Sequence, residues 1–209
     1  MISWRTKSAA MQCLAMNSYC VNMQEDTICI RAGKIILKIP PVSYKRDSLR
    51  LGISIAAPLI AGVIGSIFTS ESVSTWYQTI EKPSFSPPNW LFGPVWTTLY
   101  VLMGISLFLI WRATSTATFP TARRNRKITA FIAFGSQLIL NVLWSFIFFG
   151  LRSPQLAFAE IVILLISIVV TIVIFYKISR LAAVLMMPYA GWVTFASFLN
   201  LQIWLLNSS

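Results

Sequence analysis

The residues of this chain that are best suited to chemistry lie inside long apolar segments. Gln137, Asn141 and Trp144 follow one another at spacings of four and three, so that on a helix two amides and an indole project from nearly the same face. These groups can hydrogen-bond the polar edge of a ligand in a shared pocket. They can equally hydrogen-bond neighbouring helices, as amides inside membranes commonly do. The spacing by itself leaves both interpretations open.

Glu160 places a carboxyl group in an equally apolar segment, about one and a half helical turns after Pro154. An ionisable group in such a segment is costly, and it usually faces the interior of a helix bundle. Glu160 can pair with Lys82 or Arg152, or it can stay protonated as a hydrogen-bond donor. Neither arrangement makes it a catalytic residue.

Several kinds of site are excluded by the residue types that are missing or scattered. The 209 residues include no histidine, which removes a His-ligated haem and a His-based catalytic triad. The three cysteines, at 13, 20 and 29, have spacings that match no zinc or redox pattern. We therefore assign no catalytic residue and no metal ligand, and we expect no assembled enzyme site.

The composition is that of a membrane protein. Hydrophobic residues make up 56% of the chain and charged residues only 11%, with a mean hydropathy of +0.72, whereas a soluble domain has about 25% charged residues. Runs such as 161–175 are apolar on every side, which excludes the alternation of a transmembrane barrel. The sequence predicts an all-α, multi-pass integral membrane protein with five transmembrane helices, at about 49–69, 90–111, 128–149, 154–176 and 181–206.

The net charge of +11 is distributed unevenly along the chain. Basic residues concentrate before the first expected span and in the second and fourth loops, whereas the other two loops contribute only Lys82 and Arg152. This alternation is the positive-inside pattern, so we expect the N-terminus in the cytoplasm and the C-terminus outside. It favours membrane lipid over nucleic acid as the partner of the basic residues, and the strength of the bias favours a bacterial plasma membrane.

Residues 1–48 differ from the membrane domain expected at 49–206. They are mixed and polar, without sustained hydrophobic periodicity, and we interpret them as a disordered N-terminal extension. Within the first span, Ala57, Ala61 and Gly65 form a stripe of small residues that allows a close helix neighbour. That neighbour is either another helix of the bundle or a second subunit.

The connection at 70–89 is long for two consecutive helices and rich in proline and aromatic residues. Its prolines fix φ and favour a defined loop shape, which indicates a lid. The aromatic residues at its two ends, Trp76, Tyr77 and Trp90, either belong to the lid and a cavity beneath it or form an interfacial aromatic belt.

Three segments and one acidic residue carry a resemblance to a known family. They are WYQTIEKPSFSPPNWLFGPVWTTLY at 76–100, QLILNVLWSFIFFGLR at 137–152, Glu160, and PYAGWVTFASFLN at 188–200. In this order they resemble the tryptophan-rich sensory protein or translocator protein family (TspO/MBR), also called the peripheral benzodiazepine receptor family. The resemblance covers most of residues 49–206.

The resemblance implies a five-helix bundle, often a homodimer, whose interior pocket binds porphyrins and similar flat lipophilic molecules under the first loop. It implies a binding or sensing protein for tetrapyrroles, with a porphyrin or haem as the ligand and no obligatory cofactor. Without histidine as an axial ligand, metal-free porphyrin is expected to bind about as well as haem. The pocket residues carried over are Tyr77, Pro83, Trp90, Trp96, Gln137, Asn141, Trp144 and Trp192.

Two other functions are compatible with the same resemblance. One is transport of tetrapyrroles or other lipophilic molecules, although five spans cannot form the two equal halves typical of secondary transporters. The other is light- and oxygen-dependent porphyrin degradation, in which the pigment itself would supply the reactive chemistry.

The sequence departs from the family in two places. Phe85 stands where relatives commonly carry tryptophan, a change that a stacking residue tolerates. The tail LNLQIWLLNSS, from Leu199 on, has no tyrosine followed by a basic residue, which the cholesterol-recognition pattern of the animal proteins requires. We therefore expect weak sterol binding.

Overall fold

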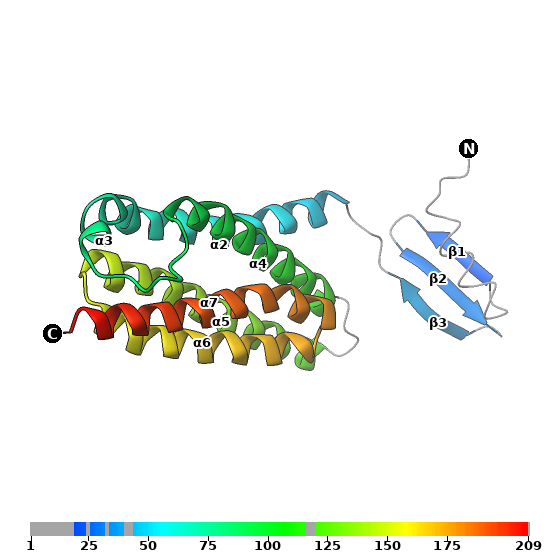
Figure 1. Cartoon of the computed structure of the whole chain (residues 1–209). Coiled ribbons are helices and arrows are strands. Elements are labelled where there is room, and N and C mark those ends of the chain that lie inside the picture. Colours follow the sequence, from blue (N-terminus) through cyan, green and yellow to red (C-terminus); the bar gives the residue numbers. More distant parts are fainter. Residues whose placement is uncertain (1–18, 24–25, 32–33, 40–43, 116–119, 209) are drawn as a thin grey trace. The chain divides into compact units, whose positions relative to one another are not determined.

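The structure is a computed structural model that describes residues 19–23, 26–31, 34–39, 44–115 and 120–208. The chain divides into two compact units, residues 1–47 and 48–209. Figure 1 shows strands in the first unit and a bundle of long helices in the second.

The first unit contains a three-stranded antiparallel sheet in the order β1-β2-β3. Its strands are β1 (Tyr19–Met23), β2 (Asp26–Arg31) and β3 (Lys34–Ile39), with a register shift between Cys29 and Ile30 where β2 pairs with β3. This differs from the extension without regular structure that the sequence suggests. The physical reason is that DTICIR and KIILKI are short runs rich in β-branched residues, two residues apart, a spacing that favours a hairpin.

The second unit confirms the predicted all-α membrane bundle. Among the described residues, five helices are long and apolar enough to cross a membrane. They are α2 (Tyr44–Ser74), α4 (Phe92–Ser115), α5 (Pro120–Ser145), α6 (Pro154–Tyr176) and α7 (Arg180–Leu206).

Local sequence signals set where the last two helices begin. The Ser153 hydroxyl accepts a hydrogen bond from the backbone N–H of Leu156, and Pro154 occupies the first turn of α6. The Ser179 hydroxyl caps α7 in the same way, by accepting from the N–H of Ala182. Both arrangements satisfy backbone donors that a helix start leaves unpaired.

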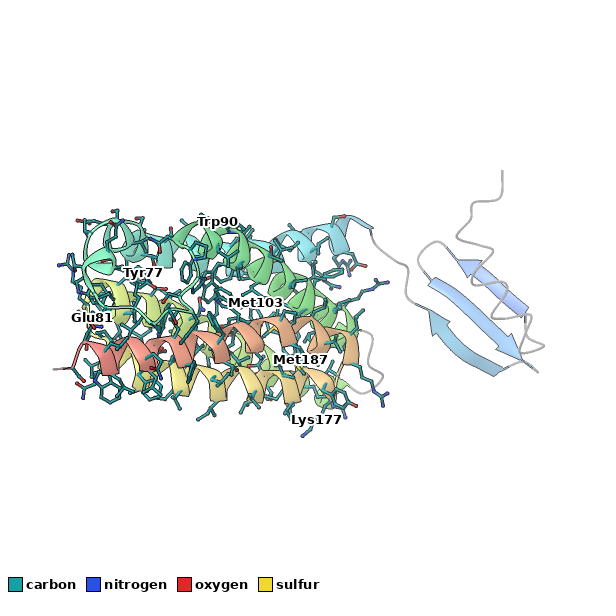
Figure 2. The ribbon with its side chains drawn as sticks, viewed as in Figure 1. Tyr77, Glu81, Trp90, Met103, Lys177 and Met187 are labelled. Carbon is teal, nitrogen blue, oxygen red and sulfur yellow. The ribbon has the colours of Figure 1, made fainter. Side chains whose placement is uncertain are left out.

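The bundle has two distinct ends, which we call the lid end and the basic end. The lid end holds α3 (Trp76–Thr79), the 3-10 turn η1 (Asn89–Leu91), the π-helical turn η2 (Phe146–Gly150) and the last turn of α7. Figure 2 shows Tyr77 and Glu81 at this end and Lys177 at the other. The basic end comprises the start of α2, the end of α4, the start of α5 and the α6–α7 connection. It carries Arg50, Arg112, Arg124, Arg126, Lys127, Lys177 and Arg180.

Helices α4, α5, α6 and α7 enclose a well-packed core toward the basic end. Met103, Ile168 and Met186 have no exposed surface. Hydroxyl groups tie the helices together, since Ser106 donates to the Ala182 carbonyl of α7 at 2.8 Å, and Thr171 donates from α6 to a carbonyl of α5 at 3.1 Å.

Helix α2 approaches its neighbours where residues are small. A Cβ on Gly62 would collide with the Tyr100 ring of α4, and a Cβ on Gly104 would lie 2.6 Å from the Ile55 Cα. Only glycine allows this approach, so Gly62 and Gly104 bring α2 and α4 together.

The stripe of small residues predicted on the first span faces α5. Ala61 and Gly65 are buried, and a Cβ on Gly65 would lie 3.3 Å from the Ser145 hydroxyl. At Gly65 the neighbour is therefore a helix of the same bundle, whereas Ala57 and Ala61 line a groove between α2 and α5.

Candidate ligand-binding site

A cavity of about 330 Å³ lies beneath the lid end, between α2, α4 and α5. Its size is within the range of small-molecule pockets, about 300–1,000 Å³. Its walls are mostly apolar and aromatic, with a few hydroxyl groups. The lining residues are Leu59, Gly62, Val63, Gly65, Ser66, Thr69, Val73, Tyr77, Phe92, Gly93, Trp96, Thr97, Tyr100, Trp144, Ser145 and Phe149.

Two indoles from different helices line this cavity. Trp96 of α4 stacks on Tyr100, with ring centroids 5.4 Å apart and an interplanar angle of 28°. Trp144 of α5 stacks on Phe148, at 5.2 Å and 23°. Each indole is held in place by a second ring, so both present fixed aromatic surface to the cavity.

The π-helical turn η2 supplies further aromatic wall. Phe148 and Phe149 are consecutive, yet both are buried, 2% and 7% exposed. Their rings meet edge to face at 4.8 Å, and both pack against Tyr77 of α3. The turn therefore joins the α5 wall of the cavity to the lid.

The lid reaches the cavity through Tyr77, which is only 3% exposed. The Lys82 ammonium donates to the Tyr77 carbonyl at 2.7 Å, and it lies 4.7 Å from the centre of the Tyr77 ring. Burial raises the pKa of the Tyr77 phenol above its ordinary value, so the phenol stays neutral at physiological pH. The segment predicted to form a lid thus contributes Tyr77 to the cavity wall.

The C-terminal end of α7 holds the lid down. The Glu81 N–H donates to the Asn207 side-chain oxygen, and the Asn207 amide donates back to the Glu81 carbonyl, both at 3.0 Å. Phe85 stacks on Phe198 at 5.5 Å. These contacts join segments more than 110 residues apart, and the sequence gives no signal of them.

A buried hydrogen-bond chain starts at the cavity wall and runs into the bundle. The Tyr100 hydroxyl donates to the Asn141 side-chain oxygen at 2.8 Å, and the Asn141 amide donates to the Tyr189 hydroxyl at 3.3 Å. Asn141 does not itself line the cavity. It therefore acts on the cavity through Tyr100 and ties α4, α5 and α7 together.

Gln137 and Glu160 are also buried, at 0% and 6% exposure. Neither side chain has a hydrogen-bond partner among the described residues. Glu160 thus pairs with neither Lys82 nor Arg152. Gln137 does not line the cavity, although it lies one helical turn from Asn141 on α5.

A smaller hollow of about 30 Å³ adjoins the main cavity and shares with it Tyr77, Phe92, Trp96, Trp144 and Phe149. Trp192 of α7 lines this hollow and not the main cavity. On the same side, the Trp144 indole N–H donates to the Asn200 side-chain oxygen at 3.1 Å. Asn200 donates in turn to the Pro154 carbonyl at 2.7 Å, so the indole has a fixed orientation.

The structure brings together some of the residues predicted for the pocket and separates others. Tyr77, Trp96 and Trp144 line the main cavity. Trp90 is 71% exposed and lies at the edge of the bundle in Figure 2, and Pro83 is half-buried in the lid without lining the cavity. The aromatic belt that the sequence left as an alternative for Trp90 stays a prediction.

Sequence reasoning missed the part of the wall that α2 provides, along with Tyr100 and Phe149. The apolar pattern of α2 does not indicate which of its faces borders a cavity. Gly62 was the available signal, since a glycine next to a small-residue stripe marks a close approach. Its partner, the Tyr100 ring, lies on another helix.

Comparison with known proteins places these features in a family. The TspO/MBR family matches residues 54–205. The chain is 46% identical over 160 residues to the tryptophan-rich protein TspO of Archaeoglobus fulgidus, covering 77% of this chain and 98% of that protein. It is 40% identical over 166 residues to the protein of the same name from Chlorobaculum tepidum, covering 78% and 98%. Human translocator protein is 34% identical over 148 residues, covering 71% and 84%.

Proposed function

Because the chain belongs to the TspO/MBR family and is a multi-pass integral membrane protein, we propose that its lid-end cavity binds a flat, largely apolar ligand of the porphyrin class. In this proposal the protein is a membrane-embedded binding or sensing protein for tetrapyrroles. The relatives' names refer to translocation or to tryptophan content, so the ligand class is argued from the cavity and from the resemblance together.

The observation that carries the proposal is the pair of indoles, Trp96 and Trp144, on two walls of one cavity. A flat aromatic ring gains dispersion and quadrupole contacts with such surfaces in a site that excludes water. Tyr77 adds a third ring from the lid. Three aromatic side chains from three separate elements suit a ligand that is itself flat and large.

The cavity offers few polar groups for hydrogen bonds to a ligand, which suits a lipophilic ligand. Tyr100 lines the cavity, and its hydroxyl gives its proton to Asn141 while its oxygen keeps an acceptor lone pair. The pyrrole N–H groups of a metal-free porphyrin are donors that match such an acceptor. Because Asn141 orients the Tyr100 hydroxyl, it acts here as a positioning residue.

The proposal is tested by titrating protoporphyrin IX into the purified protein and following the quenching of tryptophan fluorescence. Trp96→Phe shrinks one stacking surface and should weaken binding by about 1 kcal/mol, or about fivefold. Trp90→Phe is the matched control, because Trp90 is 71% exposed and does not line the cavity. Equal affinities for the two folded variants would contradict the placement of the ligand.

A further inference from the structure

The cavity is not bordered by buried residues on all sides. On the side between α2 and α4 its lining includes Val63, which is 64% exposed, and Ser66, Gly93 and Thr97, which are also exposed. These positions lie within the spans Arg46–Ser74 and Asn89–Thr114. The outer surface of a membrane-spanning helix faces lipid, so the cavity opens sideways toward the bilayer.

The two helices are close together only away from this opening. They touch at Gly62 against Tyr100 and at Gly104 against Ile55. One turn nearer the lid than Trp96, by contrast, a Cβ on Gly93 would meet no atom within 4 Å. The space between α2 and α4 therefore widens from the basic end toward the lid, and we call this widened part the slit.

The aqueous side of the cavity is closed more firmly than the slit. Asn207 holds Glu81 through two hydrogen bonds of 3.0 Å, and Phe85 stacks on Phe198. Tyr77 of the lid is itself buried. These contacts hold the lid in place, whereas no hydrogen bond between the described residues of α2 and α4 crosses the slit.

The polar groups that line the slit are also compatible with the passage of a lipophilic ligand. Its hydroxyl groups donate to carbonyls of their own helices: Ser66 to Val63 at 2.7 Å, Thr69 to Gly65 at 3.0 Å, and Thr97 to Gly93 at 2.9 Å. None of these donors is left unpaired when an apolar molecule displaces lipid from the slit. Passage therefore carries little of the cost of burying an unsatisfied polar group.

We propose that the slit between α2 and α4 is the entrance of the cavity, and that the ligand reaches it from the lipid phase. This inference rests on the proposed function, because it takes the lid-end cavity as the ligand site. A flat molecule enters edge first between Val63 and Thr97 and meets the Trp96 ring behind them. The lid then serves to exclude water and does not open for each ligand.

The test compares two neighbouring threonines on α4. Both are exposed, and both donate to the carbonyl four residues earlier at 2.9 Å, but only Thr97 lines the cavity. Thr97→Trp places an indole in the slit, and Thr98→Trp places the same indole on the adjacent lipid-facing surface. Gly93→Leu is a second blocking variant, since a side chain at Gly93 starts in open space.

The measurement is the rate of tryptophan quenching after full-length protein in liposomes is mixed with protoporphyrin IX. We expect Thr97→Trp and Gly93→Leu to slow association about tenfold, within the range over which association rates vary among variants of one site. The dissociation rate of these two variants should fall as well, because the ligand would leave through the same slit. Thr98→Trp should leave both rates at the parent values.

Two outcomes would contradict the proposal that the slit is the entrance. One is an unchanged association rate in both slit variants, with any loss of affinity appearing only as faster dissociation. The other is faster association in Asn207→Ala, which releases the lid, while the slit variants associate normally. Equilibrium affinity reports on the proposed function and association rate on the entrance, so a failure of one is distinguishable from a failure of the other.

Discussion

The basic end and the lid end of the bundle are formed by the same long helices but pack differently. Toward the basic end, Ile168, Ala182 and Met186 have no exposed surface, as expected of a close-packed protein interior. Toward the lid end, Trp96 and Trp144 are only half-buried and border a cavity. The aromatic side chains at the lid end thus border a cavity, whereas the core around Ile168 and Met186 is fully buried.

The polar contacts of the two halves differ only in part. In both halves single hydroxyls bond carbonyls of neighbouring segments, as Ser106 does with Ala182 and Ser72 with Phe149. Near the lid end amides, phenols and an indole form longer links, such as Tyr100 to Asn141 to Tyr189. These larger side chains can bridge helices that are farther apart than a single hydroxyl could reach. The helices near the cavity therefore stay connected by hydrogen bonds.

The largest effect is expected from opening a void in the packed half. Ile168→Ala removes a side chain with no exposed surface and should lower the free energy of unfolding by about 3 kcal/mol through lost packing. Ile166→Ala is the control on the same helix, since Ile166 is 60% exposed and should change stability by less than about 0.5 kcal/mol. Unfolding in detergent mixtures, followed by circular dichroism, measures both. Similar losses would show that the packed half is not tightly packed.

A smaller effect is expected from adding a single methyl group to α4. Gly104→Ala brings a Cβ within 2.6 Å of the Ile55 backbone and should destabilise the protein by about 2 kcal/mol, as overpacking does. Gly93→Ala introduces the same methyl group where nothing lies within 4 Å, and it should be nearly neutral. The same unfolding measurement applies, and a neutral Gly104→Ala would mean that α2 is not held against α4 there.

The smallest effect is expected at the lid. Asn207→Ala removes both side-chain hydrogen bonds to the Glu81 backbone, and it should lower the local opening free energy of the lid by about 1 kcal/mol. Amide hydrogen exchange in residues 76–91 should quicken about fivefold, while the packed half is unchanged. Ser208→Ala is the control, because its hydroxyl bonds only the Leu205 carbonyl. Equal exchange in both variants would argue against a clamped lid.

Much of the fold could be predicted because it depends on hydrophobicity summed over consecutive residues, which the sequence gives directly. The five spans follow from runs of about 20 apolar residues, and the described helices cover each predicted range. The lid followed from proline content in a long connection, and Tyr77, Trp96 and Trp144 were all expected at the pocket. The strands at residues 19–39 were not predicted, because short apolar runs in a polar segment are weak signals.

The sequence by itself determined the membrane class, the helix count, the segregation of basic residues and the aromatic side chains available for a ligand, because each depends on local composition and spacing. Only the tertiary structure decided that Trp96 and Trp144 face one cavity whereas Trp90 lies outside. It also decided that Asn141 reaches the cavity through Tyr100 and that α2 leaves a slit beside Gly93. These features depend on the rotation and separation of helices, which contacts between residues distant in the chain determine.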